Sequence, residues 1–170
     1  AFVQKLGQFI TGMRGDHSLF RLNAHHRSHA SVPREILAYC DYDQEKNIFN
    51  IPPLRELMAK SVIVSTCQTA SSLIGIGMTQ GHFTHIFIDE ACQVLEPAAL
   101  IPLSLADSNT VVVLTGDEQQ IGPHTFSPSA TQHGLRLSLL ERLLLLPVYK
   151  NAALQELDQD VKNAKSSAPA

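Results

Sequence analysis

The sequence predicts an α/β fold built on a doubly wound, mostly parallel sheet. Short apolar runs rich in β-branched residues alternate with segments of helical periodicity, which is typical of such sheets. Two of these runs end directly in polar clusters, at the edge where open α/β sheets bind their ligands. With 170 residues and 44% hydrophobic content, the chain is large enough for one buried core.

The first half of the chain is expected to alternate between helices and strands. Apolar residues recur at helical spacing from Ala1 to Ile10, which predicts an opening amphipathic helix. Pro33 fits the first turn of a helix over Ser31–Ala38, because the first turn leaves its amide groups unbonded. The other expected elements are a strand over Leu19–Asn23, a helix over Pro53–Ala59, a strand over Ser61–Thr66 and a helix over Gln68–Ile74.

The second half is expected to contain the two strands that end in polar clusters. A loop over Gly75–Gly81 leads to a strand over Ile86–Ile88, and a second strand follows over Thr110–Thr115. A helix over Ser138–Leu146, ended by Pro147, is expected to pack four leucines inward: Leu139, Leu140, Leu143 and Leu144. Because the composition turns polar and alanine-rich after Lys150, we expect one domain over residues 1–150 and a disordered tail over 151–170.

The first polar cluster, Asp89-Glu90-Ala91-Cys92-Gln93, has the residues that ATP hydrolysis needs. A strand-terminal Asp89 can hold hydrated Mg²⁺ near the phosphates, since Mg²⁺ prefers hard oxygen ligands. Glu90 leaves the chain in a different direction and can orient the attacking water or take its proton. An Asp-Glu pair after a strand is also common as a plain strand end or helix N-cap, so the pair alone does not decide.

The second cluster runs from Gly116 to Pro123 and follows the strand over Thr110–Thr115. Gln120 can sense the γ-phosphate, because an amide both donates to phosphate oxygen and accepts from water. Gly116 and Gly122 allow the backbone to approach a ligand closely. Two such clusters, in this order and at strand ends, indicate ATPase ancestry.

Together the two clusters resemble motifs II and III of superfamily 1 helicases, with the pattern Asp-Glu-Ala-x-Gln followed by Gly-Asp-x-x-Gln-Ile-x-Pro. The closest likeness is to the RNA-silencing and nonsense-mediated-decay branch, which includes the Armitage-like and zinc-finger-containing RNA helicases. Further similar segments bring the resemblance to residues 1–149: 21–24, 32–40, 82–88 and 138–143. The resemblance implies the first RecA-like domain, a P-loop NTPase fold.

The resemblance also implies cofactors and residue roles. ATP and Mg²⁺ are the expected cofactors, with Asp89 serving Mg²⁺ and Glu90 and Gln120 acting in catalysis. The residues implied to contact or brace the nucleotide side are Gln93, Gly116, Asp117 and Gln120. The strand end at Ser65 and Thr66 is implied to contact the backbone of single-stranded RNA. The open alternative is that Ser65, Thr66 and Thr69 only cap the following helix.

One part of such a motor is missing from the sequence. A Walker A loop needs a Gly-Lys pair, and no Gly-Lys dipeptide occurs in the 170 residues. The arginine finger of a second RecA-like domain is absent too. We therefore expect a piece of a longer helicase that is inactive by itself and works with a second RecA-like domain of the same chain.

Two other interpretations stay open. The chain could be a non-hydrolysing RNA- or protein-binding module derived from such a helicase. It could also belong to a DNA helicase, because motifs II and III act on ATP in both RNA helicases and DNA helicases. A Gly-Lys-Thr loop encoded upstream would favour the truncated motor over the module.

The composition bounds the remaining possibilities. The net charge of −3 argues against a broadly basic surface, so any RNA contact should be local. Three widely spaced cysteines favour neither disulfides nor zinc, which suits a cytoplasmic or nuclear protein, and no apolar stretch suggests a membrane partner. Arg21–Arg34 holds three arginines and three histidines without an acid, and is either a phosphate-binding surface or a solvated loop.

Overall fold

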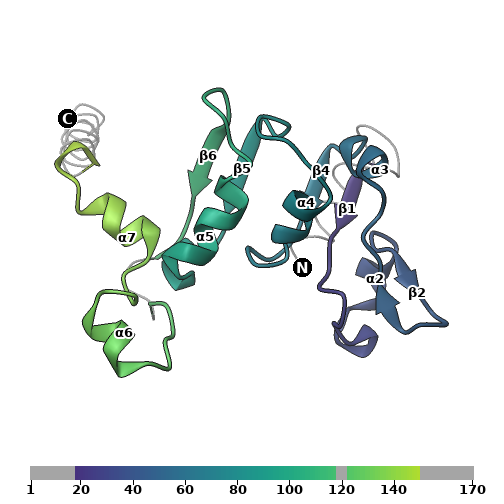
Figure 1. The fold of residues 1–170 in the computed structure, drawn as a ribbon, viewed down its shortest axis with the longest axis horizontal. Coiled ribbons are helices and arrows are strands. Elements are labelled where there is room, and N and C mark those ends of the chain that lie inside the picture. Colours follow the sequence, from purple (N-terminus) through teal and green to yellow (C-terminus); the bar gives the residue numbers. More distant parts are fainter. Residues whose placement is uncertain (1–17, 118–121, 150–170) are drawn as a thin grey trace, which may run out of the picture. The chain divides into compact units, whose positions relative to one another are not determined.

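The computed structural model describes residues 18–117 and 122–149, whose elements are drawn in Figure 1. The opening helix expected over 1–10, Gln120 and the expected tail lie outside the described residues. The chain divides into two compact units. The first contains residues up to Ile86 together with Leu100–Val112, and the second contains Phe87–Ala99 together with the residues from Val113 onward.

A parallel strand pair forms the centre of the first unit. Strands β1 (Leu19–Arg21) and β4 (Val62–Val64) pair in register, with Phe20 opposite Ile63, and lie side by side in Figure 1. Helices α3 (Leu54–Met58) and α4 (Ser71–Gly75) belong to the same unit and each contribute a buried leucine to its core. The buried side chains of this core are Phe20, Leu22, Leu57, Leu73, Met78 and Leu105.

Two predicted helices begin later than the sequence suggested. The helix expected from Ser31 is split into a 3₁₀ helix η1 (His29–Ser31) and α2 (Arg34–Leu37). Val32 between them is extended (φ −99°, ψ 124°), because the ring of a following proline disfavours the helical conformation. The helix expected from Gln68 begins at Ser71, after a turn over residues 67–70.

A β-hairpin in the first unit was not predicted. Strands β2 (Tyr42–Asp43) and β3 (Ile48–Phe49) pair antiparallel, and Asn47 before β3 adopts a positive φ of 55°. Phe49 is buried with Val32 and Ile36 in a small cluster of its own. Each strand has only two residues, which is too short for a periodicity to appear in the sequence.

The two strands that end in the polar clusters are present and adjacent. Strands β5 (His85–Ile88) and β6 (Val111–Leu114) form a two-stranded sheet and lie side by side in Figure 1. The bonds from Val111 N to Thr84 O and from Thr115 N to Ile88 O advance in the same direction along both strands, so the pair is parallel. Among the described residues the strands form three separate two-stranded sheets, whereas we expected one continuous sheet.

Four further helical segments follow β5. They are the 3₁₀ helix η2 (Ala91–Gln93), α5 (Glu96–Leu103), α6 (Pro128–Gln132) and α7 (Leu139–Leu144), of which only α7 was predicted. The inward packing predicted for α7 is wrong at Leu144, which is 37% exposed, whereas Leu139 is 6% exposed. A six-residue helix can turn only one narrow face inward. No helix within the described parts of the chain combines the length and apolar character needed to cross a membrane.

Candidate nucleotide site

The chain makes a strained turn as it leaves β5. Glu90 has φ 53° and ψ 38°, a left-handed conformation that costs a non-glycine residue about 1 kcal/mol. The turn leads into η2, whose Ala91 and Cys92 are buried, whereas Asp89 and Glu90 are both exposed. The reversal thus leaves two consecutive carboxylates at the surface while the following residues anchor the turn.

One oxygen of Asp89 is held by the protein and the other is open. Asp89 Oδ1 accepts a hydrogen bond from Thr115 Oγ1 at 2.9 Å and from the Glu90 amide at 3.0 Å. No group of the described residues bonds to Oδ2. A fixed, exposed carboxylate with a free oxygen has the donor chemistry that Mg²⁺ or its bound water requires.

The two polar clusters meet through backbone contacts. The Ala91 amide donates to the Thr115 carbonyl at 2.7 Å. A Cβ on Gly116 would lie 3.0 Å from the Cys92 nitrogen and 3.1 Å from the Ala91 nitrogen, which is tighter than most real contacts. Glycine at position 116 therefore lets the end of β6 lie against η2, and the expected meeting of the clusters at one edge is confirmed.

Gln93 contacts Glu90 directly. Its Nε2 donates to Glu90 Oε2 at 3.1 Å, and both side chains are exposed. The amide lies one turn after Glu90 and limits the directions that the carboxylate can take. A nucleotide contact was predicted for Gln93 from the family resemblance. Its bond to Glu90 orients that carboxylate, which the spacing alone did not indicate.

The remaining predicted nucleotide-side residues are described only in part. Asp117 follows directly on Gly116 and is exposed. Gln120 lies outside the described residues. The chain is described again from Gly122, and the following Pro123 is fully buried.

The two residues predicted to contact nucleic acid, Ser65 and Thr66, belong to the first unit. Thr66 Oγ1 accepts from the Thr69 amide at 3.1 Å and is 2.8 Å from Thr69 Oγ1. Thr66 therefore caps the turn before α4, which is the alternative role considered for it. A hydroxyl has one donor and two acceptor positions, so capping leaves room for a phosphate contact by Thr66 or by the half-buried Ser65.

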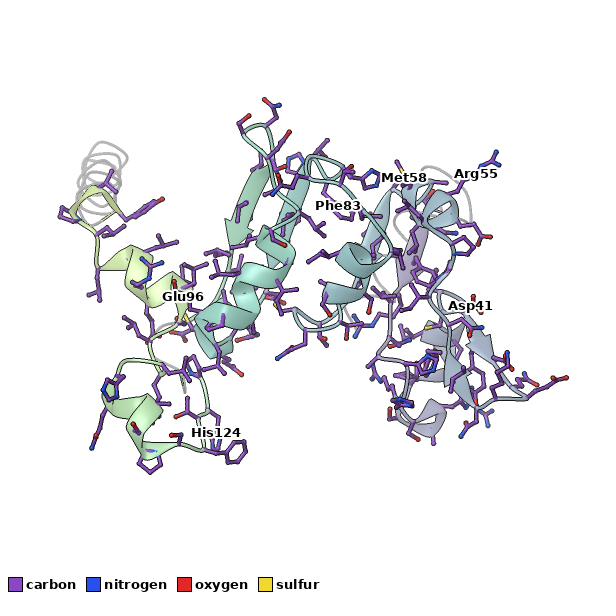
Figure 2. All side chains as sticks on the ribbon, in the orientation of Figure 1. Asp41, Arg55, Met58, Phe83, Glu96 and His124 are labelled. Atoms are coloured by element: carbon purple, nitrogen blue, oxygen red, sulfur yellow. The ribbon has the colours of Figure 1, made fainter. Side chains whose placement is uncertain are left out.

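An ion pair and a helix cap hold α7 to the segment after η2, and neither was predicted from the sequence. Arg142 donates to both carboxylate oxygens of Glu96, at 2.6 and 2.8 Å, and Figure 2 labels Glu96 at the start of α5. This pairing lowers the pKa of Glu96 and raises that of Arg142. Fully buried Ser138 forms a capping box with Glu141 and a β-bridge to Leu95. The Ser-x-x-Glu spacing was the available signal.

The basic stretch Arg21–Arg34 is largely engaged in local structure. Arg27 donates to Asn23 Oδ1 at 3.0 Å and to the Ser31 carbonyl at 3.4 Å, while His25 Nδ1 lies 3.1 Å from the Phe49 carbonyl. These bonds favour the solvated-loop alternative over a phosphate-binding surface. Within the described residues, no group of three or more His, Cys, Asp or Glu side chains is placed to hold a metal ion.

Paired parallel strands that end in polar clusters are typical of P-loop NTPase-like folds. In agreement, residues 39–128 match the profile of a family described as an AAA domain. Relatives include the putative helicase mov-10-B.2 of Danio rerio, which is 36% identical over 75% of this chain and 13% of its own length.

Two mouse proteins are similar as well. RNA helicase Mov10l1 is 38% identical over 78% of this chain and 10% of its own length. A probable helicase with zinc finger domain is 36% identical over 62% of this chain and 5% of its own length. The chain belongs to the Mov10-type superfamily 1 helicase family, in which it matches the first domain. It spans a small part of the length of these relatives.

Proposed function

We propose that this chain carries the Mg²⁺-binding and water-activating part of an ATP-driven RNA helicase. The observation that carries the proposal is the Asp89 carboxylate, which the Thr115 hydroxyl holds by one oxygen, while no group of the described residues bonds to the other. A plain strand end or N-cap needs no such second support from a neighbouring strand. The adjacent Glu90, oriented by Gln93, supplies the second acid at the same edge.

Each residue has a distinct role in this proposal. When bound, Mg²⁺ neutralises phosphate charge and orients the γ-phosphate for in-line attack. Asp89 holds the ion directly or through water, and Glu90 accepts the proton of the attacking water. Gly116 lets Asp117 approach the nucleotide, and Gln120 senses the γ-phosphate.

The finer parts of the proposal rest on family membership. We propose that the parallel pairs β1–β4 and β5–β6 are parts of one doubly wound RecA-like sheet. Single-stranded RNA is the proposed nucleic-acid substrate, because relatives are named as RNA helicases. Ser65 and Thr66 are proposed to contact its backbone. A second RecA-like domain of the same protein completes the site. A role in RNA silencing and a cytoplasmic or nuclear location remain part of this proposal. The location is in keeping with Cys40, Cys67 and Cys92, which form no disulfide within the described part of the chain.

The proposal is tested by RNA-stimulated ATPase assays on the full-length gene product. Glu90→Gln should lower kcat by about 10² to 10⁴ with little change in KM, because it removes the general base and keeps the shape. Asp89→Asn should raise the Mg²⁺ concentration needed for half-maximal activity. Arg34→Gln, an exposed change in α2 outside the nucleotide site, is the control and should leave both parameters unchanged.

The same assay separates the proposal from its alternatives. The 170-residue chain alone should release no phosphate above background, because it contains no Gly-Lys pair to cradle the phosphates. Full-length protein that binds RNA without any Glu90-dependent hydrolysis would support the non-hydrolysing module instead. Stimulation by single-stranded DNA and not by RNA would support the DNA helicase.

A further inference from the structure

The loop between Gly122 and α6 exposes an aromatic ring. Phe126 is 95% exposed, more than any other large apolar side chain among the described residues. The ring of His124 packs edge-on against it, with centroids 4.6 Å apart and an interplanar angle of 68°. Figure 2 labels His124 on this loop. An edge-on partner leaves the face of an aromatic ring available for stacking.

The loop is fixed on both sides of Phe126. Pro123 is fully buried, and Thr125 Oγ1 lies 2.7 Å from Thr131 Oγ1 in α6. On the other side, Ser127 Oγ accepts from the Ala130 amide at 3.2 Å and caps α6. Phe126 therefore projects from a tethered backbone, so a ligand that stacks on it does not have to order a free loop.

The surroundings of Phe126 in the sequence suit a polyanion. Residues 122–140 contain no Asp or Glu, although the chain as a whole carries a net charge of −3. The segment offers the fixed positive charge of Arg136 and the ring nitrogens of His124 and His133. Proteins that bind single-stranded nucleic acids combine aromatic side chains, on which bases stack, with positive charge that follows the backbone. This segment supplies one of each in Phe126 and Arg136.

We propose that Phe126, supported edge-on by His124, stacks against a base of a single-stranded nucleic acid. The inference rests on the proposed function, because it assigns to the motor a base-stacking site that immediately follows the second polar cluster. Bases stack on aromatic faces whatever their identity, so the site is tolerant of sequence and requires an unpaired strand.

The absence of tryptophan from the chain allows a direct test. In the 170-residue chain, Phe126→Trp introduces a single fluorescent indole, to be titrated with a single-stranded oligoadenylate of about 15 nucleotides. Stacking should quench its emission, and annealing the same strand to its complement should abolish the quenching. Phe87→Trp makes the same exchange at a 69% exposed position in β5 and should show no quenching.

A binding assay with the fluorescently labelled oligonucleotide completes the test. Phe126→Ala should weaken binding about 5-fold or more, and Phe126→Tyr should keep it. Because the ring is exposed, the melting temperature of each variant should match that of the wild type. The proposal is overturned if the indole is not quenched, or if Phe126→Ala binds within twofold of wild type.

The outcomes also separate this inference from the proposed ATPase. Quenching at position 126 without Glu90-dependent hydrolysis in the full-length protein supports the stacking site and refutes the motor. Hydrolysis that depends on Glu90, together with an unquenched indole, refutes the stacking site alone.

Discussion

Thr115 donates its hydroxyl to Asp89 Oδ1 across 2.9 Å and so joins the ends of β6 and β5. This hydrogen bond fixes the rotamer of the Asp89 carboxylate. Without it, the amide of the left-handed Glu90 would be the carboxylate's one hydrogen-bond donor among the described residues. Thr115 is thus a positioning residue for the proposed Mg²⁺ ligand, and its contribution should appear in Mg²⁺ dependence.

Replacing Thr115 tests that role. Thr115→Val keeps the shape and β-branching but removes the hydroxyl, so we expect the Mg²⁺ concentration for half-maximal ATPase activity to rise about 5- to 10-fold. Thr115→Ser, which retains the donor, should restore most of the lost affinity. A Thr115→Val variant with the Mg²⁺ dependence of the wild type would show that the bond to Asp89 does not position the carboxylate.

The left-handed conformation of Glu90 predicts a conflict between stability and activity. Glycine adopts this conformation without the steric cost, so Glu90→Gly should raise the free energy of unfolding by up to about 1 kcal/mol in urea titrations, whereas Glu90→Ala should not. Both variants should abolish the proposed hydrolysis. A Glu90→Gly protein no more stable than Glu90→Ala would show that the turn is unstrained.

The parts of this site that the sequence predicted are those encoded by local pattern. The strands before Asp89 and Gly116 could be expected, because consecutive β-branched residues favour strands, and parallel strand ends share an edge. The orienting bond from Gln93 to Glu90 could not, because it depends on the unusual backbone of Glu90. No local sequence pattern predicts the left-handed conformation of Glu90.

Pairings between distant segments were also missed. Glu96 and Arg142 lie 46 positions apart in the sequence, and no local pattern around either residue predicts that the two pair. Helix α5 was not predicted, and its two prolines are unfavourable helix residues. Pro97 lies in the first turn, where proline is tolerated, whereas Pro102 lies inside the helix. Local rules thus predicted the strand ends, while tertiary contacts determined the elements that brace them.

The close contact at Gly116 predicts that adding one methyl group there lowers the stability of the fold substantially. Gly116→Ala would press its Cβ against the Cys92 and Ala91 backbone nitrogens, so we expect a loss of about 1–3 kcal/mol in the free energy of unfolding. Gly75→Ala is the matched control, because Gly75 lies in α4 with nothing within 4 Å of its Cβ position. That variant should be neutral or slightly stabilised, since alanine favours helix.

The Glu96–Arg142 pair predicts a pH-dependent difference in stability. Arg142 holds the pKa of Glu96 below its ordinary value, mainly by hydrogen bonding, so the native state favours the ionised carboxylate. The contribution is therefore present in full above the ordinary pKa of glutamate and is lost as the pH falls through the lowered value. Since the side chains of Arg142 and Glu96 remain 46% and 26% exposed, solvent screens the pair, and we expect Glu96→Gln to lower the urea midpoint by only about 0.1–0.5 M at pH 7.

Comparison of wild type and Glu96→Gln across pH isolates this pair. Asp43 and Asp107 also have lowered pKa values, from hydrogen bonds to nearby backbone and side-chain donors, but both titrate identically in the two proteins and cancel in the difference. The midpoint difference should persist from pH 7 to about pH 5. It should shrink as the pH falls below the ordinary pKa of glutamate and through the lowered pKa of native Glu96, because the carboxyl is then protonated in the native chain as well. In an Arg142→Gln background, the same Glu96→Gln exchange should give a much smaller difference at pH 7. An unchanged difference in that background would mean that Glu96 acts through something other than Arg142, and that the ion pair does not hold α7 in place.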